Sequence, residues 1–404
     1  MRIATISTAA GLAALLAAGA GTALAGNDTD DDIIVGFATA KSGILQAYDQ
    51  PAERAAKIAI KEINESGGLL GKQIEVVDAD TKSDRNEGVK AGQSVIDEGA
   101  DIVVATCDYD YGAPAASVGQ DAGLISFFLC AEDVKAGIEG VGPFAFSPSI
   151  LAAVQGATMA EWGYKERGAR TAYVLVDTSI DYNKSVCYGF DWMFPKVGGQ
   201  IIGRDSFRND DPSIASQITR IKSLAEQPDV IMLCSHNPGG ASAVKQIRAA
   251  GIDQPIYGGS TNDGSYWLDA VQNLSNFVVP VQGSVYGDDP NPKVEAFNKK
   301  FEATYGARPS SQYTYPGFVL IEVWAKAVER AGTTETEAVV AELEKMRDEP
   351  TLVGPRTFTS ELHHQNIGRY LLAEVTDGKF SIVDEWTISE PVPMDILFSG
   401  VTGN

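Results

Sequence analysis

The sequence predicts an α/β protein of two lobes, each built on a doubly wound parallel sheet, joined by a hinge of several strands. Short β-branched runs alternate with longer amphipathic stretches, which is typical of βαβ units. The alternation restarts near Thr171, after a loop from Gly137 to Pro148 that is rich in glycine and proline. A chain of 404 residues is also longer than one hydrophobic core usually serves, which favours two lobes.

The first 25 residues are predicted to be a secretory signal peptide. Arg2 precedes an apolar run from Gly11 to Ala20, and Ala23-Leu24-Ala25 provides a small-x-small cleavage pattern that ends at Ala25. The apolar stretch of about 15 residues is shorter than the roughly 20 that a spanning helix needs. No cysteine follows it for lipid attachment, and no later segment is apolar and long enough to span a bilayer. We therefore expect an exported, soluble protein.

The elements are expected in the following order. Residues 32–148 form the N-terminal lobe, residues 149–280 form the C-terminal lobe, and residues 281–404 cross between the lobes and complete both, with part of 281–340 returning to the first. Helices follow from the 3.6-residue period of apolar positions, and the stretch from Ala52 to Ser66 ends at Gly67-Gly68, a helix stop. Strands are expected at 33–38, 73–79, 102–106, 124–128, 171–176, 200–205, 230–234 and 256–258, and helices at 52–66, 85–98, 151–161, 215–226, 240–250, 310–331 and 335–346, before a β-rich tail from 369 to 386.

Charge and cysteine content restrict the function. A formal net charge of −22 argues against nucleic acid or anionic lipid as a partner, because both need a basic surface. Four cysteines in an exported protein permit two disulfides, and sequence alone leaves three pairings open. Cys107–Cys130 is favoured because both residues fall at the ends of neighbouring predicted strands, which leaves Cys187–Cys234. Their spacing is not that of a zinc site, so no metal is expected.

Several motifs occur in an order and spacing that resemble one known family. They are Ile34-Val35-Gly36 with Ser42-Gly43, the stretch Asn64-Glu65-Ser66-Gly67-Gly68-Leu69-Leu70-Gly71-Lys72 after a helix, Phe297-Asn298-Lys299-Lys300-Phe301, and Val375-Thr376-Asp377-Gly378-Lys379-Phe380. The chain resembles the type I periplasmic binding proteins of the branched-chain amino acid transport group over nearly its whole mature length.

The resemblance implies a function as well as a fold. It implies a monomeric periplasmic receptor, without a cofactor, that closes by a hinge motion on a small amino-acid- or amide-like molecule. The receptor then passes this ligand to the membrane permease of an ABC importer. A soluble ligand sensor for a signalling partner is the alternative, although a membrane-bound sensor would need a spanning helix or a fused output domain that the sequence does not provide.

Ligand-binding residues are expected where strands end, because ligands of open parallel sheets sit outside the carboxyl ends of the strands. Both lobes would present such loops to a common cleft. In the second lobe the loops contain Thr178, Asp181, Ser235, His236, Thr261 and Asn262 besides the residues named next. The predicted ligand-binding residues are Ser42, Tyr48, Asp108, Tyr109, Asp110, Phe128, Cys130, Glu132, Tyr182 and Asp263.

Two loops depart from the family pattern. In the loop after the third expected strand, amino-acid-binding members have small hydroxyl residues, whereas this chain has Cys107-Asp108-Tyr109-Asp110-Tyr111. In the loop after the fourth strand, they have an Ala-Thr type pair, whereas this chain has Leu129-Cys130-Ala131-Glu132-Asp133. Carboxylates directed into the cleft would repel a ligand carboxylate and favour a cationic or aromatic ligand, with tyrosines supplying flat faces. Alternatively, Asp108 caps the following helix and Asp110 faces solvent.

An enzyme is not expected from this sequence. It contains no Walker loop, dinucleotide fingerprint, HExxH motif or Gly-x-Ser-x-Gly elbow, and its three histidines do not form a catalytic set with other residues. His363 and His364 lie in a late segment that resembles the family's His-Gln element, which favours a structural role.

Overall fold

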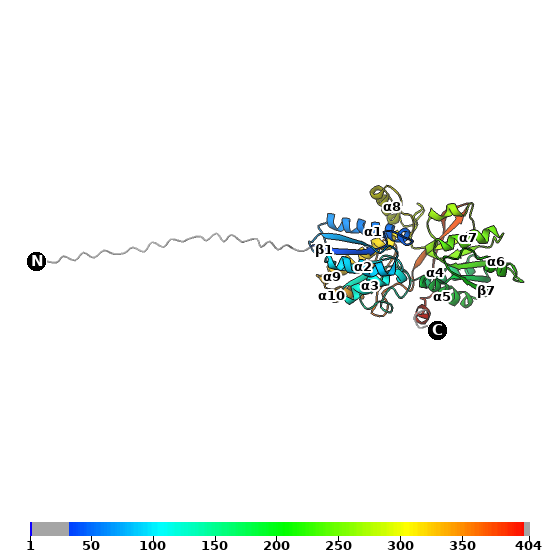
Figure 1. Ribbon diagram of the computed structural model, residues 1–404, viewed down its shortest axis with the longest axis horizontal. Coiled ribbons are helices and arrows are strands. Elements are labelled where there is room, and N and C mark those ends of the chain that lie inside the picture. Colours follow the sequence, from blue (N-terminus) through cyan, green and yellow to red (C-terminus); the bar gives the residue numbers. More distant parts are fainter. Residues whose placement is uncertain (2–31, 400–404) are drawn as a thin grey trace. The chain divides into compact units, whose positions relative to one another are not determined.

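The computed structural model describes Met1 and residues 32–399 of the chain. The predicted signal peptide and its cleavage site after Ala25 lie outside the described residues. Residues 32–399 contain two separate sheets, each with helices packed against it, as the sequence predicts (Figure 1).

The first sheet is parallel throughout, with strand order β2-β1-β3-β4-β5. The chain begins at β1, the second strand from one edge, adds β2 on one side and then β3, β4 and β5 on the other, which is the doubly wound arrangement. The connecting helices each pack on the sheet through an apolar face. The strands are β1 (Ile33–Thr39), β2 (Ile74–Asp80), β3 (Ile102–Ala105), β4 (Ile125–Phe128) and β5 (Ala145–Phe146), and the helices are α1 (Gln46–Glu65), α2 (Arg85–Asp97) and α3 (Tyr109–Asp121).

The second sheet has the order β12-β11-β10-β9-β8-β6-β7. Its strands from β7 to β10 are parallel, whereas β11 and β12 form an antiparallel hairpin at one edge. The strands are β6 (Thr171–Asp177), β7 (Gln200–Phe207), β8 (Val230–Cys234), β9 (Ile256–Gly258), β10 (Phe277–Val281), β11 (Arg369–Thr376) and β12 (Lys379–Thr387); the helices are α4 (Ala152–Lys165), α5 (Asp181–Lys196), α6 (Ala215–Lys222), α7 (Gly239–Ala249) and α11 (Met394–Leu397), with short 3-10 helices at Ser260–Asn262 and Ser265–Ala270.

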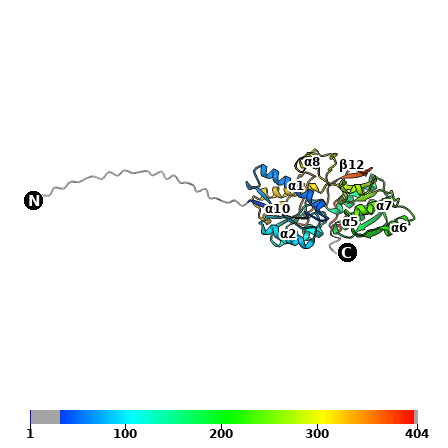
Figure 2. The same ribbon diagram turned by 45° about the horizontal axis from the view of Figure 1, so that its top comes forward.

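Three further helices return to the first sheet after β10. They are α8 (Pro292–Tyr305), α9 (Thr314–Ala331) and α10 (Thr336–Leu343), and they lie in the same half of the molecule as α1 and α2 (Figure 1). Figure 2 shows α8 and α10 there from a second direction. Trp324 and Val319 of α9 belong to the same buried cluster as Phe37 of β1. We call the first sheet with α1–α3 and α8–α10 the first lobe, and the second sheet with α4–α7 and α11 the second lobe.

Close helix contacts depend on glycine in both lobes. A Cβ on Gly189 of α5 would lie 1.7 Å from the carbonyl oxygen of Ala153 in α4, and one on Gly156 of α4 would lie 1.8 Å from that of Val186 in α5. In the first lobe, a Cβ on Gly317 of α9 would lie 1.9 Å from the oxygen of Ala52 in α1. Only a residue without a side chain allows these backbones to approach so closely.

The chain crosses between the lobes three times, and one arginine connects the three crossings. The crossings are residues 147–151, 282–291 and 344–368, and the first pairs with the third through a bridge between Ile150 and Gln365. Arg356 in the third crossing donates hydrogen bonds to the carbonyl of Pro148 in the first and, at 2.8 Å, to Oε1 of Gln282 in the second. Its side chain is 1% exposed, and burial lowers its pKa to about 10, so it remains a cation at neutral pH.

Both expected disulfides are present. Cys107 and Cys130 join the chain just after β3 to the chain just after β4, with Cα atoms 4.4 Å apart, and Cys187 and Cys234 join α5 to β8 with Cα atoms 5.8 Å apart. The first bridge therefore connects the two loops that depart from the family pattern.

Some elements differ from the sequence prediction. The helix α1 begins at Gln46, six residues before the expected start, and β5 lies inside the expected Gly/Pro-rich loop. Strand β10 is not among the expected strands; it contains Pro280, and proline is rare in central strands. In the structure only Phe277 and Val278 pair with β9, so Pro280 lies beyond that ladder.

The start of α2 provides a first test of the structure. The Asp84 carboxylate accepts hydrogen bonds from the backbone N–H groups of Asn86 at 2.8 Å and Glu87 at 3.0 Å. We expect Asp84→Ala to lower the free energy of unfolding by about 1 kcal/mol, because two N–H groups lose their acceptor. Asp97→Ala at the other end of the same helix should leave stability unchanged or raise it slightly, because a carboxylate there opposes the helix dipole. Urea denaturation of both variants measures the difference, and equal losses would contradict the capping role.

Candidate functional site: a pocket between the lobes

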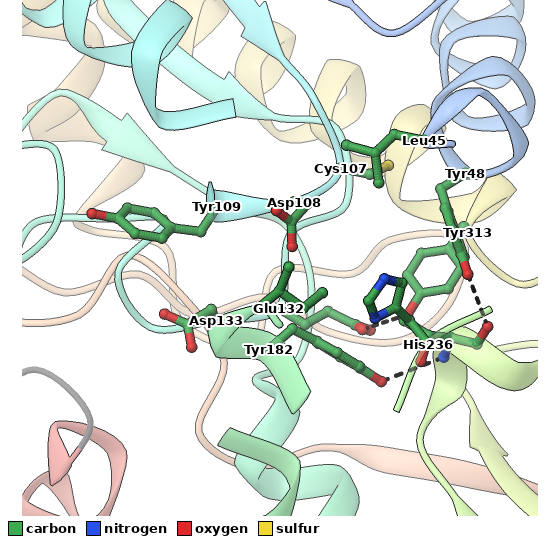
Figure 3. Close-up of a pocket in the computed structure, with 12 residues that line it drawn as sticks. Leu45, Tyr48, Cys107, Asp108, Tyr109, Glu132, Asp133, Tyr182, His236 and Tyr313 are labelled. Carbon is green, nitrogen blue, oxygen red and sulfur yellow. Dashed lines mark hydrogen bonds between the residues drawn. The ribbon is translucent and has the colours of Figure 1, made fainter. Parts of the chain in front are cut away.

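A pocket lies where the carboxyl ends of strands from both sheets face each other (Figure 3). Its cavity is about 30 Å³, compared with the roughly 10–15 Å³ that a cavity needs to hold one water molecule. An organic ligand therefore needs the lobes to separate before it can enter. The lining consists of Leu45, Tyr48, Cys107, Asp108, Tyr109, Glu132, Asp133 and Tyr313 from the first lobe and Ile180, Tyr182, His236 and Thr261 from the second.

Hydrogen bonds across the pocket hold the lobes together. The hydroxyl of Tyr48 donates to the carbonyl of Thr261 at 3.2 Å and accepts from the N–H of Asn237 at 3.2 Å. Outside the pocket lining, the N–H of Asp181 donates to the carboxylate of Asp110 at 2.9 Å. The structure is therefore a closed form, since these contacts exist only when the lobes meet.

Glu132 lies at the centre of these contacts. Its Oε2 accepts hydrogen bonds from Ser260 Oγ of the second lobe at 2.9 Å and from the Tyr313 hydroxyl of the first lobe at 2.7 Å. In Figure 3 its carboxylate points toward Tyr313 and His236. The side chain is 3% exposed, and this burial raises its pKa to about 7. Loss of water around the carboxylate thus outweighs the hydrogen bonds that favour its charged form.

Asp108 both caps a helix and lines the pocket. Its Oδ1 accepts a hydrogen bond from the N–H of Tyr111 at 3.2 Å, at the start of α3. Burial, followed by the nearby charge of Asp110, raises its pKa well above the ordinary value. The two alternatives that the sequence left open for Asp108 therefore hold together in one conformation.

The third pocket carboxylate, Asp133, has partners for both oxygens. Oδ1 accepts from the N–H of Lys135 at 2.9 Å and Oδ2 accepts from the hydroxyl of Ser185 in the second lobe. The ammonium group of Lys135 forms an ion pair with Asp181 at the start of α5, which is a further contact between the lobes. The same Asp181 also binds Lys184, three residues later in its own helix.

His236 and Tyr182 complete the second-lobe wall. The Nδ1 atom of His236 lies 3.2 Å from the Asn183 amide nitrogen and 3.3 Å from that of Asn209, and burial lowers its pKa. The ring is therefore neutral at pH 7. The hydroxyl of Tyr182 donates to Oε1 of Gln155 in α4 at 2.8 Å, which fixes the orientation of its ring.

Half of the predicted ligand-binding residues line the pocket. Tyr48, Asp108, Tyr109, Glu132 and Tyr182 are in the lining, as are His236 and Thr261, which the sequence also placed in cleft loops. The other five lie outside the lining. Ser42 binds Asp80, Asp110 binds Arg85, and Phe128 lies in the core. Cys130 is in a disulfide, and Asp263 binds the hydroxyl of Tyr286 and the N–H of Gln312.

The sequence prediction missed Tyr313, Leu45, Asp133 and Ile180. Tyr313 immediately precedes α9 and belongs to the segment that returns to the first lobe after the second crossing. No strand end precedes it in the sequence, so the rule that found the other residues could not find this one. Leu45 and Ile180 are the residues just before α1 and α5, so the true helix starts would have identified them.

Comparison with known proteins identifies the family. The sequence model of the family described as periplasmic binding protein matches residues 32–379. The chain is 23% identical to the Leu/Ile/Val-binding protein BraC3 of Rhizobium johnstonii over 357 residues, which cover 84% of this chain and 91% of that protein. It is 22% identical to the leucine-, isoleucine-, valine-, threonine- and alanine-binding protein of Pseudomonas aeruginosa over 315 residues, 78% of this chain and 82% of the other.

Solved structures share the fold. The branched-chain amino acid transporter substrate-binding protein LivJ of Streptococcus pneumoniae, in complex with isoleucine, superimposes with a TM-score of 0.78 at 24% identity over 88% of this chain and 99% of the other. A solute-binding protein of an ABC transporter from Rhodopseudomonas palustris, in complex with 3,4-dihydroxybenzoic acid, gives a TM-score of 0.75 at 18% identity over 89% and 99%. Within residues 32–399, no helix combines the length and the apolar composition that crossing a membrane requires. From its fold and from the match over residues 32–379, the chain belongs to the periplasmic binding protein family.

Proposed function

We propose that the protein is the solute receptor of an ABC importer, which captures a small amino-acid- or amide-like molecule between its lobes and delivers it to the membrane permease. It acts as a monomer in the periplasm, after cleavage behind Ala25, and performs no catalysis. The observation that carries the proposal is the pocket between the lobes, with hydrogen bonds across it that form only on closure. A protein built in this way converts ligand binding into a change of shape that a partner can recognise.

The ligand class in this proposal draws on the relatives. By name, both curated relatives described above bind leucine, isoleucine and valine, and the second also binds threonine and alanine. The pocket here is small, enclosed and lined by tyrosine, leucine and isoleucine together with carboxyl groups, which is the mixture of apolar walls and few polar groups that small-molecule sites have.

Two lysines that bind one carboxylate allow closure to be tested. Lys135 of the first lobe and Lys184 of the second both contact Asp181, so only the Lys135 pair is broken when the lobes separate. We expect Lys135→Gln to weaken ligand binding about threefold to fivefold, because a partly buried ion pair of the closed form contributes about 1 kcal/mol. Lys184→Gln should leave binding unchanged.

The experiment uses the mature protein with the amino acids and their amides as probes. Thermal shifts identify a ligand, calorimetry measures its affinity, and small-angle scattering measures the radius of gyration with and without it. A ligand should raise the melting temperature and reduce the radius of gyration. Equal affinities of the two lysine variants, together with a scattering profile unchanged at saturation, would refute closure around the ligand.

A further inference from the structure

Glu132 has an oxygen that no group of the protein satisfies. Oε2 accepts two hydrogen bonds, but Oε1 is buried without a hydrogen-bond partner among the described residues. A buried carboxylate oxygen without a partner destabilises the folded protein. Glu132 lines the pocket and is 3% exposed. The side-chain amides of Gln155 and Gln312 lie close enough to lower its pKa, and Oε1 remains open to a further donor from a ligand.

Asp108 makes the N-terminus of helix α3 less able to bind an anionic group of a ligand. The N-terminus of a helix ordinarily attracts an anion through its free N–H groups. Here the Asp108 carboxylate already accepts from the N–H of Tyr111 at the start of α3. A ligand carboxylate at this position would meet the Asp108 carboxyl group in place of free N–H groups.

No protein cation balances the carboxyl groups of Glu132 and Asp108. The lining contains three carboxyl residues and, among the residues that the structure describes, no lysine or arginine. Its single histidine, His236, is neutral because burial lowers its pKa. Two cations beside the cleft have carboxylate partners: Lys135, whose ammonium group lies over the ring of Tyr109, pairs with Asp181, and Arg85 pairs with Asp110.

Building on the proposed function, we infer that the pocket binds an organic monocation without a carboxylate group, such as an amine or an amino acid amide, whose charged nitrogen lies beside Glu132 and Asp108. The nitrogen donates to, or lies against, Oε1 of Glu132. The rings of Tyr48, Tyr182 and Tyr313 in the same lining supply apolar faces for the rest of the ligand and an attractive surface for its charge.

The electrostatics of the free site agree with this inference. Burial raises the pKa of Glu132 to about 7, so the site takes up a proton when no other cation is close. A bound ammonium group replaces that proton and stabilises the carboxylate. Around Glu132, the phenols of Tyr182, Tyr313 and Tyr370 stay neutral because burial raises each pKa. The other titratable groups of the pocket lining are Tyr48, Asp108, Tyr109, Asp133 and the neutral His236.

Matched pairs of compounds test the inference directly. The wild-type mature protein is titrated by calorimetry with L-leucinamide and L-leucine, choline and glycine betaine, and benzylamine and benzoate, each pair having a similar shape and differing by a carboxylate. We expect binding of at least one cation, at least tenfold tighter than binding of its carboxylate partner. Affinity for the cation should rise from pH 6 to pH 8, because Glu132 must lose its proton, and the proton released should appear as a dependence of the heat on the buffer.

Two variants test whether Glu132 and Asp108 bind the charged nitrogen of the ligand. Glu132→Gln keeps the acceptor for Ser260 and Tyr313 but removes the charge, and it should weaken cation binding at least tenfold and flatten the pH dependence. Asp108→Asn keeps a side chain that caps α3 and should weaken binding by a smaller factor. Glu161→Gln is the control, because Glu161 is a buried carboxylate of α4 outside the pocket, and its change should leave affinity unaltered.

The outcomes separate this inference from the proposed function. Tighter binding of leucine, glycine betaine or benzoate than of the matched cation would overturn the inference while the receptor function stands. If Glu132→Gln binds the cation as tightly as the wild-type protein does, the charged nitrogen of the ligand does not lie beside Glu132, and the inference is wrong. Binding of none of the six compounds at millimolar concentration would also overturn the inference, whereas the closure test with Lys135 and Lys184 remains independent of it.

Discussion

Replacement of Arg356 by alanine is expected to lower the free energy of unfolding by about 3–5 kcal/mol, because it removes a buried cation and leaves its acceptors without donors. Arg356 donates to Pro148 and Gln282, and to the carbonyls of Gly354 at 3.3 Å and Pro355 at 3.0 Å. The acceptors at Pro148 and Gln282 belong to two other crossings, so one substitution loosens all three. Urea denaturation of the ligand-free protein measures the loss.

Arg347 provides the matched control for Arg356. It lies in the same crossing, but it is exposed and donates only to Glu344, Met346 and Phe358, all within that segment. Arg347→Ala should therefore lower stability by less than about 1 kcal/mol, as surface changes usually do. Arg356→Lys should fall between wild type and alanine, because an ammonium group cannot reproduce the planar fork of donors. Similar losses for Arg347→Ala and Arg356→Ala would show that Arg356 does not join the crossings.

The second large effect is expected for Gly189→Ala. The added Cβ would lie 1.7 Å from the carbonyl oxygen of Ala153, and backbone rather than a mobile side chain is the obstacle. Helices α4 and α5 would have to move apart, which should lower the free energy of unfolding by about 3 kcal/mol or more. Since Tyr182 lies in the first turn of α5 and Gln155 in α4 fixes its hydroxyl, ligand affinity should fall as well.

Gly88 serves as the control for this substitution. It is a buried glycine within α2, and a Cβ there would meet its nearest neighbours at 3.4 Å, an ordinary van der Waals distance. Gly88→Ala should leave stability unchanged or raise it by up to about 1 kcal/mol, because alanine favours the helix. Thermal denaturation of the two variants should therefore shift in opposite directions, and a destabilised Gly88→Ala with a stable Gly189→Ala would contradict the described packing.

Local pattern predicted most of the strands, but it gave no range for helices α3, α5 and α8 and did not predict the complete sheets. The expected strands at 33–38, 102–106 and 230–234 correspond closely to β1, β3 and β8, because each is a buried apolar run between turns. Strand β5 has two residues and β10 contains Pro280, so neither has a sequence signature. The membership of β11 and β12 in the second sheet depends on pairing over about a hundred residues of chain, which no local pattern encodes.

The residues of the candidate site were predictable from the sequence only in part. Strand ends identified Tyr48, Asp108, Glu132 and Tyr182 because parallel sheets place ligands there. They also identified Cys130 and Asp263, whose side chains are used by a disulfide and by contacts with Tyr286 and Gln312. Whether a loop side chain points into the pocket is decided by its partners in three dimensions, and these are visible only in the folded chain.

The three crossings also determine when each lobe can fold. Helix α9 supplies Val319 and Trp324 to the core around β1, and β11 and β12 complete the edge of the second sheet. A chain that becomes available from its N-terminus therefore cannot complete its first core before Phe358 is free, or its second before β11 and β12 are free. A protein whose domains follow one another along the sequence has no such delay. Such delayed folding favours an extended nascent chain, the form in which a protein can be threaded through a narrow membrane channel.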